Sequence, residues 1–420
     1  MRPEAGPGRI ALDGDGSMMM VLRNFISLCL VSAVALVTAG CGPSERGDEG
    51  QEAGSNAVDA GVAPPTKWPL FRGNSEAHGV SPELLELPLR LRWSFDTGEE
   101  VTATATIADS SVYVGSTSGV FYALDLASGE PRWSFDTEFA IEGTACVLDR
   151  LVIFGGKDGM VYALERDTGE LRWKFETSDQ ILGGVNAWKN DAGETILVVG
   201  SYDYFLYGLR AQDGTELWSV ETDNFVNGTP TISEGRVSFG GCDGLLHLVD
   251  VESGEEISAI EIGAYISNSV AVRDNIAYVA HFGNKVEAFA LASGEKVWEF
   301  KDRSFEYFAS PAVTADRVYA GGRDKRLHCL DRITGEQIWE FEARRSVDSS
   351  PVVCPNAIYV GSDDGWLYAL DPASGEEIWA YEIGDEVKSS PAIAQRVLVI
   401  SGGDGVVYAF EGGAESSKAD

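Results

Sequence analysis

Histidine and cysteine are scarce in this chain, with four histidines and six cysteines among 420 residues. The histidines show no pairing at metal-ligand spacing, and no two cysteines form a Cys-x-x-Cys motif, so metal binding by these residues is not indicated. No Ser-His-Asp arrangement and no phosphate-binding loop stands out in the sequence. These absences argue against hydrolytic and phosphoryl-transfer chemistry.

Positive charge is also scarce. The chain has 32 Lys and Arg against 66 Asp and Glu, and its formal net charge is −34 at pH 7. Such a chain repels phosphate backbones, which argues against nucleic-acid binding. It also repels anionic lipid head groups, so any membrane attachment has to come from acyl chains. The acidic surface is either a solubility device or an acidic docking face.

Long apolar runs are missing as well. The apolar stretch at residues 25–39 is shorter than the roughly 17–25 residues that span a bilayer. It follows Arg23 and ends in VTAGC at residues 37–41, which is typical of a secretory signal. A Cys directly after Ala-Gly resembles a bacterial lipobox. We therefore expect residues 1–40 to be a signal peptide and Cys41 to be lipidated; the alternative is an ordinary cleaved signal with a chance cysteine.

The segment that follows Cys41 has no periodicity. Residues 42–67 are rich in Gly, Ala, Pro, Ser and acidic residues, and such a segment cannot bury enough apolar surface to offset the entropy of ordering. We expect residues 41–67 to be a lipidated, acidic, flexible tether and residues 414–420 to be a disordered tail. The three methionines at 18–20 are expected to mark the true start of the protein.

What the sequence does contain is an internal repeat. Its core is A-x-D-x-x-x-G-x-x-x-W, as in Ala123, Asp125, Gly129 and Trp133, and Ser258 replaces the Trp in one copy. The steps along the Trp column are 40, 40, 45, 40, 40, 41 and 40 residues. A fixed period near 40 residues with several strands in each unit indicates a propeller or a solenoid.

Each unit reads as four strands, and the strand count indicates a closed ring. Eight third strands are present, but the last, which ends at Phe410, has no fourth strand after it, whereas residues 91–96 form a spare fourth strand at the front. We predict an all-β fold over about residues 89–413: an eight-bladed β-propeller with four-stranded antiparallel blades. Residues 91–96 would complete the blade of residues 389–411 and close the ring. The five extra residues of the third unit are expected in a hairpin turn at 186–194.

These units resemble the tryptophan-docking motifs of the PQQ-like (quinoprotein alcohol dehydrogenase-like) β-propeller superfamily, and WPLFRG at 68–73 is similar to a phrase common before such repeats. The resemblance covers residues 68–413, which we take as the propeller domain. It implies that each Trp docks between neighbouring blades over small Ala and Gly residues, a scaffold role that suits a large flat side chain. At Ser258 we expect a weaker seam. The docking column comprises Trp93, Trp133, Trp173, Trp218, Trp298, Trp339 and Trp379.

The superfamily has two functional branches. Quinone-dependent dehydrogenases need PQQ, a Ca²⁺ ion and an Asp base, and many carry two adjacent cysteines; this chain has no adjacent cysteine pair and is compact. BamB-like lipoproteins are non-enzymatic scaffolds that help insert outer-membrane β-barrels. The resemblance implies such a scaffold: without cofactor, monomeric, lipid-anchored at the outer membrane facing the periplasm, and bound to envelope proteins of the outer-membrane assembly machinery. A PQQ- and Ca²⁺-dependent dehydrogenase and a polysaccharide- or peptide-binding sensor are the alternatives.

The first strand of each unit faces the ring axis and supplies the candidate ligand-binding residues. Glu142, Asn227 and Asp348 could offer oxygen ligands to a cation, and Lys388 adds a positive charge. They belong to different units, so they need not converge, and solvated channel lining is the alternative to a ligand or metal site. The full column is Thr102, Glu142, Leu182, Asn227, Ser267, Phe308, Asp348 and Lys388.

The remaining cysteines and two of the histidines are assigned to packing. His247 and His328 stand at the third-strand position of Tyr122 and Tyr368, so we expect them inside the blades. The cysteines beyond the tether are expected to be buried free thiols, with a Cys329–Cys354 disulfide as the alternative. They are Cys146, Cys242, Cys329 and Cys354.

Overall fold

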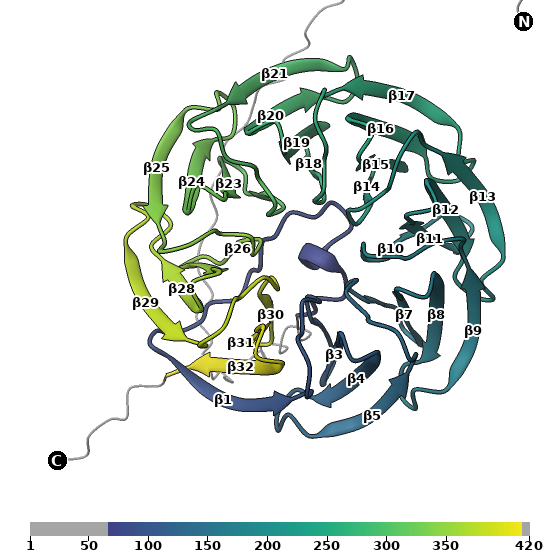
Figure 1. Cartoon of the computed structure of the whole chain (residues 1–420), viewed down its shortest axis with the longest axis horizontal. Helices are drawn as coiled ribbons and strands as arrows, with labels where there is room; N and C mark the ends of the chain where they lie inside the picture. The colour runs from purple at the N-terminus through teal and green to yellow at the C-terminus, as the bar shows by residue number, and fades with distance from the viewer. Residues whose placement is uncertain (1–65, 414–420) are drawn as a thin grey trace, which may run out of the picture. The chain divides into compact units, whose positions relative to one another are not determined.

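The computed structural model describes residues 66–413 as a ring of eight four-stranded antiparallel sheets around a central axis (Figure 1). The eight-bladed, all-β prediction is therefore confirmed. The predicted signal peptide, true start, lipidated Cys41, most of the tether and the tail lie outside the described residues. Among the described residues no helix is long and apolar enough to cross a membrane, and the helical element is the short 3-10 turn η1 (Phe71–Gly73).

Each blade runs from an innermost strand near the axis to an outermost strand at the rim. The innermost strands are β2 (Thr106–Ala108), β6 (Cys146–Val147), β10 (Asn186–Lys189), β14 (Thr231–Ser233), β18 (Ala271–Arg273), β22 (Ala312–Val313), β26 (Val352–Val353) and β30 (Ala392–Ala394). The second strands are β3 (Ser111–Gly115), β7 (Leu151–Gly155), β11 (Thr195–Gly200), β15 (Arg236–Gly240), β19 (Ile276–His281), β23 (Arg317–Gly321), β27 (Ile358–Gly361) and β31 (Val397–Ser401).

The third strands are β4 (Val120–Asp125), β8 (Met160–Glu165), β12 (Phe205–Arg210), β16 (Leu245–Asp250), β20 (Lys285–Ala290), β24 (Arg326–Asp331), β28 (Trp366–Leu370) and β32 (Val406–Gly412). The outermost strands are β5 (Pro131–Asp136), β9 (Leu171–Glu176), β13 (Glu216–Glu221), β17 (Glu256–Glu261), β21 (Glu295–Phe300), β25 (Gln337–Glu342), β29 (Glu377–Glu382) and β1 (Leu89–Asp96). We number the blades 1 to 8 in the order of their innermost strands, so β1 belongs to blade 8.

The burial of the strands explains their sequences. Second strands are buried along their whole length, as in β3, or at every residue but the first, as in β7, because each sheet packs against a neighbouring blade on both faces. Outermost strands alternate, as in β5, because they form the rim and are half in solvent. The turn between the second and third strands of blade 2 places Gly159 at a φ of 78°, the left-handed conformation that an Asp-Gly hairpin turn requires.

The ring closes as predicted, because β1 pairs antiparallel with β32, with Phe95 opposite Val407. The strand is two residues longer than expected at its start, since it begins at Leu89. The insertion of the third unit differs in detail from the prediction. Residues 186–189 extend the innermost strand β10 of blade 3, and the turn covers residues 190–194.

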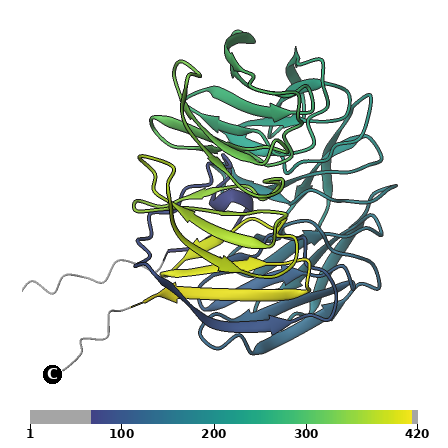
Figure 2. The same cartoon turned by 60° about the vertical axis from the view of Figure 1, so that its left-hand side comes forward.

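Residues 66–88, which we call the strap, cross one face of the ring before the first blade begins (Figures 1 and 2). The strap exchanges main-chain hydrogen bonds with the innermost strands of successive blades: Trp68 with Ile107, Val147 with Pro69, Ile232 with Ser75 and Val313 with His78. Val272 and Val353 are held in the same way by Glu76 and Gly79. The sequence did not predict this role, because backbone bonds leave no side-chain pattern.

Candidate functional site

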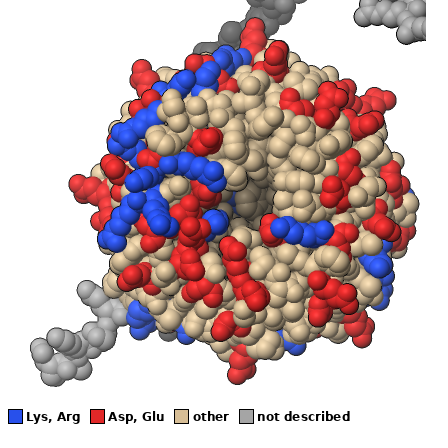
Figure 3. Space-filling view, in the orientation of Figure 1, with Lys and Arg blue, Asp and Glu red and all other residues tan. Residues whose placement is uncertain are grey.

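The axial channel is closed at one end by the strap and opens at the other end, which we call the mouth. The strap binds the middle or last residues of the innermost strands, whereas the predicted ligand column lies before those strands begin. The channel holds a cavity of about 170 Å³, and Phe71 of the strap lines its closed end. Figure 3 shows the mouth as a hollow at the centre of the ring.

A belt of hydroxyl groups runs around the channel inside the mouth. At six successive positions a Ser or Thr hydroxyl accepts a hydrogen bond from a main-chain N–H of the preceding blade. For example, Ser269 Oγ accepts from Thr229 N at 2.9 Å, and Ser350 Oγ accepts from Ser310 N at 2.9 Å. The belt continues between blade 8 and blade 1, because Thr104 Oγ1 accepts a hydrogen bond from Ser390 N at 3.1 Å. The belt explains why small hydroxyl residues recur in the first strands of the repeat.

The predicted ligand residues sit at the mouth but do not converge on one site. Glu142, Asn227 and Lys388 line the cavity, whereas Asp348 does not. The charged residues are each paired with a neighbour: Glu142 with Lys157 at 2.6 Å, Asp348 with Arg323 at 3.0 Å, and Lys388 with Glu386 at 2.7 Å. Asn227 donates from Nδ2 to Cys242 Sγ at 3.0 Å.

These residues do not fit a calcium-bound quinone. The cavity of about 170 Å³ is smaller than the roughly 300–1,000 Å³ that small-molecule and cofactor sites enclose. The carboxylates of Glu142 and Asp348 already contact cationic side chains, so they are not arranged as a common oxygen cage.

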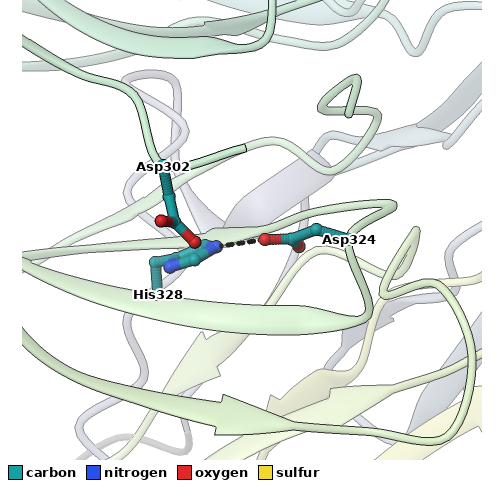
Figure 4. Close-up of side chains that lie close together, drawn as sticks. All are labelled: Asp302, Asp324 and His328. Atoms are coloured by element: carbon teal, nitrogen blue, oxygen red, sulfur yellow. Dashed lines mark hydrogen bonds and ion pairs between the residues drawn. The ribbon is translucent and has the colours of Figure 1, made fainter. Parts of the chain in front are cut away.

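One group of potential metal ligands lies outside the mouth. Asp302, Asp324 and His328 place ligand atoms within 4.8 Å of one another (Figure 4). However, His328 Nε2 lies 2.9 Å from Asp324 Oδ2, and Tyr368 makes the equivalent bond to Asp364 at 2.8 Å. The pair is thus a repeated packing feature of the third strands, and the guanidinium of Arg326 approaches Asp302 at 3.6 Å. A metal centre is not supported.

His247 and His328 fill the tyrosine position of the third strand in their blades. His247 Nε2 lies 2.8 Å from Asp243 Oδ2, as His328 does from Asp324. Burial lowers the pKa of His247, but the hydrogen bonds to Asp243 and Glu256 outweigh this effect and raise its pKa above the ordinary value. These contacts hold the imidazole of His247 inside blade 4.

The four cysteines of the described residues are free thiols. Three of them are buried, and burial raises the pKa of Cys146, Cys329 and Cys354 to about 12, which leaves them unreactive. Cys242 differs from the expectation of burial, because it is half-buried beside Asn227 at the mouth.

Tryptophan indoles fill the seams between blades. The ring of Trp133 lies so close to Gly169 of blade 2 that a Cβ there would come within 2.6 Å of it, and its Nε1 donates to Arg166 O at 3.0 Å. Trp379 packs instead edge-on against Phe410 of blade 8, with ring centroids 5.8 Å apart. The N–H donation to the next blade recurs for Trp93, Trp133, Trp173, Trp218, Trp298 and Trp339.

Some of the large hydrophobic residues that the structure describes are exposed to solvent. Those of them that are aromatic all lie on the mouth face. In each blade the turn between the second and third strands bonds to the loop before an innermost strand, as Lys157 N does to Ala140 O, and these two kinds of segment form the face. The exposed aromatic residues all lie in them, with 36–55% of each residue accessible. They are Phe139, Tyr204, Tyr265, Phe305 and Phe308.

Basic residues join these aromatic residues on one side of the mouth. Figure 3 shows Lys and Arg gathered beside the hollow, over the blades of β22–β29. The guanidinium of Arg323 lies 3.9 Å from the ring centroid of Phe308, and that of Arg344 lies 5.3 Å from the ring of Trp366. We define the basic–aromatic patch as Arg303, Phe305, Phe308, Arg323, Arg344 and Arg345. In the sequence its signal is the FEYF run at 305–308, which places Phe308 in the column that holds Glu142 and Lys388 in other units.

Comparison with known proteins supports a common ancestry. A family model described as outer membrane protein assembly factor BamB matches residues 90–299, 207–353 and 323–416. The chain is 27% identical over 140 residues to a 1-butanol dehydrogenase (quinone) of Thauera butanivorans, a match that covers 31% of this chain and 19% of that protein. It is 24% identical over 180 residues to the outer membrane protein assembly factor BamB of Yersinia pestis, covering 39% and 44% of the two chains. The matches thus span less than half the length of these curated relatives.

Solved structures share the fold. The chain superimposes on BamB from Moraxella catarrhalis with a TM-score of 0.67 and 20% identity, covering 77% of this chain and 99% of the other. It superimposes on the quinohemoprotein alcohol dehydrogenase from Comamonas testosteroni with a TM-score of 0.72 and 14% identity, covering 84% and 82%. At these identities the likeness concerns the fold.

Proposed function

Because this chain belongs to the family of the outer membrane protein assembly factor BamB, within the PQQ-like β-propeller superfamily, we propose that it is a non-catalytic scaffold of the cell envelope. In this proposal the protein binds partner proteins through its mouth face. The observation that carries the proposal is the basic–aromatic patch, where exposed aromatic rings and arginines lie together at the mouth.

The composition of the patch is that of a protein interface. Aromatic residues and Arg are enriched at protein–protein interfaces and supply most binding hot spots, whereas Lys, Glu and Asp are depleted there. Arg323 stacked on Phe308 presents a flat, partly desolvated surface of this kind. In a chain of net charge −34, a cluster of arginines favours a partner that presents carboxylates and apolar groups.

The pattern of variation within the repeat points to the same face. Inside the channel the blades present nearly uniform Ser, Thr and Gly residues, which the hydroxyl belt requires. At the mouth each blade presents a different side chain, from Glu142 through Phe308 to Lys388. A scaffold that only had to close the ring would not need this difference, whereas a surface that recognises one partner would.

The relatives and the sequence also support a cellular setting for this scaffold. The names of the relatives support a role in outer-membrane protein assembly, so we propose the outer-membrane β-barrel assembly machinery as the partner. The lipobox-like residues at 37–41 support anchoring through Cys41 at the outer membrane, with the propeller in the periplasm as a monomer.

A pull-down from detergent-solubilised envelopes tests the proposal. Reversing two charges of the patch in R344E/R345E should lower partner recovery at least tenfold. The matched control is R150E/K189E, which makes the same charge change at the strap side of blades 2 and 3 and should recover the partner like the wild type. Equal recovery by both variants would contradict binding through the patch. Recovery of partners that never include an assembly component would exclude the outer-membrane assembly role while leaving the scaffold role intact.

One observation favours the dehydrogenase alternative, namely the similarity to quinone-dependent enzymes. The paired carboxylates and the small channel disfavour it. Absorption spectroscopy with added PQQ and Ca²⁺, followed by a dye-linked oxidation assay with alcohols and sugars, decides between the two. Saturable quinone binding with alcohol oxidation would favour the enzyme, and the absence of both is the expected result.

A further inference from the structure

One seam between blades differs from the others. At the seam of blades 3 and 4, Trp218 Nε1 donates to Val251 O at 3.0 Å, and a Cβ on Gly254 would lie 2.6 Å from the indole ring. The seam of blades 4 and 5 has Ser258 in the place of the tryptophan. Gly294 is the glycine against which a tryptophan ring would pack at this seam. A Cβ placed on Gly294 would have Ile260 Cγ1 as its nearest side-chain atom, at 3.5 Å.

The seam that lacks an indole contains a cleft of about 600 Å³. Leu291 lines the cleft, and its carbonyl corresponds to the Val251 carbonyl that accepts from Trp218; no described side chain donates to it. The cleft volume lies in the range of sites that bind small ligands or side chains. Its principal lining residues are Ser258, Ile260, Lys285, Leu291, Gly294 and Lys296.

Two further positions beside Ser258 also differ from the blades that carry a tryptophan. Tyr278 and Tyr319 lie behind Trp298 and Trp339 at centroid distances of 6.0 and 5.8 Å, whereas blade 4 has Ser238 at that position. Leu248 stands opposite Ser258, where blade 5 has Ala288 opposite Trp298. Leu248 does not line the cleft.

The chain cannot fill this cleft with a tryptophan of its own from outside the described residues. All ten tryptophans lie within residues 66–413, and residues 1–65 and 414–420 contain none. The cleft lies between β17 and β21, which form the outer rim of the ring in Figure 1. It is therefore accessible to another molecule without any movement of the strap or of the mouth.

The charges around the cleft disfavour an anionic occupant. Lys285 bonds to Glu287 at 3.4 Å and to Glu299 at 3.1 Å, and Lys296 contacts both carboxylates at 3.2 and 2.5 Å. Both cations are therefore already paired, and Glu261, which also lines the cleft, adds a further negative charge, so a carboxylate would be repelled. An indole adds no charge and brings one N–H donor for the Leu291 carbonyl.

We propose that the cleft between blades 4 and 5 is a docking site for a tryptophan side chain of a partner protein. The ring would lie on Gly294, and its N–H would donate to Leu291 O, in the manner of the tryptophans at the other seams. The site would anchor a partner segment along the rim, separately from the mouth. It does not depend on the basic–aromatic patch, and R344E/R345E would leave it unchanged.

Amide NMR titration with N-acetyl-L-tryptophanamide tests the proposal on the intact propeller. The probe should shift the amides of Leu291 and Gly294 in a saturable manner, and N-acetyl-L-leucinamide should bind at least tenfold more weakly. The variant S258W/L248A restores the pairing seen for Ala288 and Trp298. It should lose probe affinity at least tenfold and melt at a higher temperature than the wild type.

Three outcomes would overturn the proposal: shifts elsewhere in the ring or none, equal binding of the leucine probe, or unchanged affinity in S258W/L248A. If that variant does not fold, photo-crosslinking decides instead. p-Benzoylphenylalanine in place of Ser293, beside the cleft, should label the tryptophan probe. The same substitution at Ser253, beside the seam that Trp218 fills, should not, and equal labelling at both positions would exclude the site.

Discussion

Nε1 of Trp93 donates a hydrogen bond to the main-chain oxygen of Leu126 at 3.0 Å. This bond joins β1, the first strand of the ring, to blade 1, while the same strand is paired with β32 of blade 8. Trp93 therefore sits at the seam where the two ends of the repeat meet, and its indole is 8% exposed. The β1–β32 pairing closes the ring without a covalent connection, and Trp93 fixes the closing strand β1 against blade 1.

Replacing Trp93 by Ala should destabilise the whole propeller. Removing a buried Trp costs about 3–5 kcal/mol through lost contacts and the cavity left behind. We expect W93A to lower the free energy of unfolding by that amount in a urea titration, and S258A, which removes only a hydroxyl at the unfilled seam, to change it by less than about 0.5 kcal/mol. A W93A effect as small as that of S258A would contradict closure at this seam.

Gly79 and Arg72 pack against each other inside the strap. A Cβ at position 79 would lie 2.0 Å from Arg72 Nη2, and Gly79 has a φ of +65°. Arg72 is 1% exposed, so its side chain has little room to move aside. We expect G79A to cost about 2 kcal/mol or more and to expose the strap to proteases.

The control for G79A is G98A. Gly98 has a φ of +85°, and no atom lies within 4 Å of the place that an alanine Cβ would occupy, so this substitution tests the backbone conformation alone. G98A should cost about 1 kcal/mol and leave cleavage of the strap unchanged. Equal protease sensitivity in both variants would mean that the contact between Gly79 and Arg72 does not hold the strap.

Asp363 makes the mouth sensitive to pH. Burial, with the nearby charges of Asp348 and Glu386, raises the pKa of Asp363 from 3.8 to about 6. Because the folded state holds this proton more tightly than the unfolded chain, the resulting stability is present below pH 3.8 and is lost as the pH rises through 6. Since the group is half exposed, we expect D363N to stabilise the protein by about 1 kcal/mol at about pH 7.5.

Thermal melts of D363N and wild type between about pH 4 and pH 8 measure this effect. The stability gained from the substitution should grow as the pH rises from about 4 to 7 and then level off. A gain that does not change across this range would show that Asp363 titrates at its ordinary pKa.

Glu287 should have the opposite dependence. Burial raises its pKa, but the hydrogen bond and charge of His281, together with those of Lys296, outweigh this and lower the pKa to about 2. The stability from ionised Glu287 is therefore present above its unfolded pKa of 4.5 and is lost as the pH falls towards 2. E287Q should cost about 2 kcal/mol at neutral pH and progressively less below about pH 4.5 in denaturant titrations. A constant cost at all pH values would contradict this.

Those parts of the fold that recur along the chain could be predicted from sequence. The Trp column, the Asp-Gly turns and the spare strand at 91–96 determined the number of blades and the closure, because each is repeated at a constant spacing. The strap could not be predicted in the same way. Residues 66–88 hold the blades through main-chain bonds, which any sequence can make, and only WPLFRG at 68–73 pointed to that segment.

The candidate site was harder to predict, because it depends on contacts between blades. Asp348 was assigned to the channel by its place in the repeat, yet it pairs with Arg323 of the preceding blade and does not line the cavity. The arrangement of Phe305, Phe308 and Arg344 on one face depends on how the loops of three blades fold over the mouth. Only Ser258, a single break in a regular column, marked the second site directly in the sequence.

Crosslinking in intact cells tests most directly whether the mouth binds a protein. p-Benzoylphenylalanine would replace Phe305 in the basic–aromatic patch or, as the control, Ile333, which is 65% exposed in the turn between β24 and β25. We predict a discrete protein adduct from position 305 that is lost in R344E/R345E, and no such adduct from position 333. Adducts from position 333 with none from position 305 would contradict a partner-binding mouth.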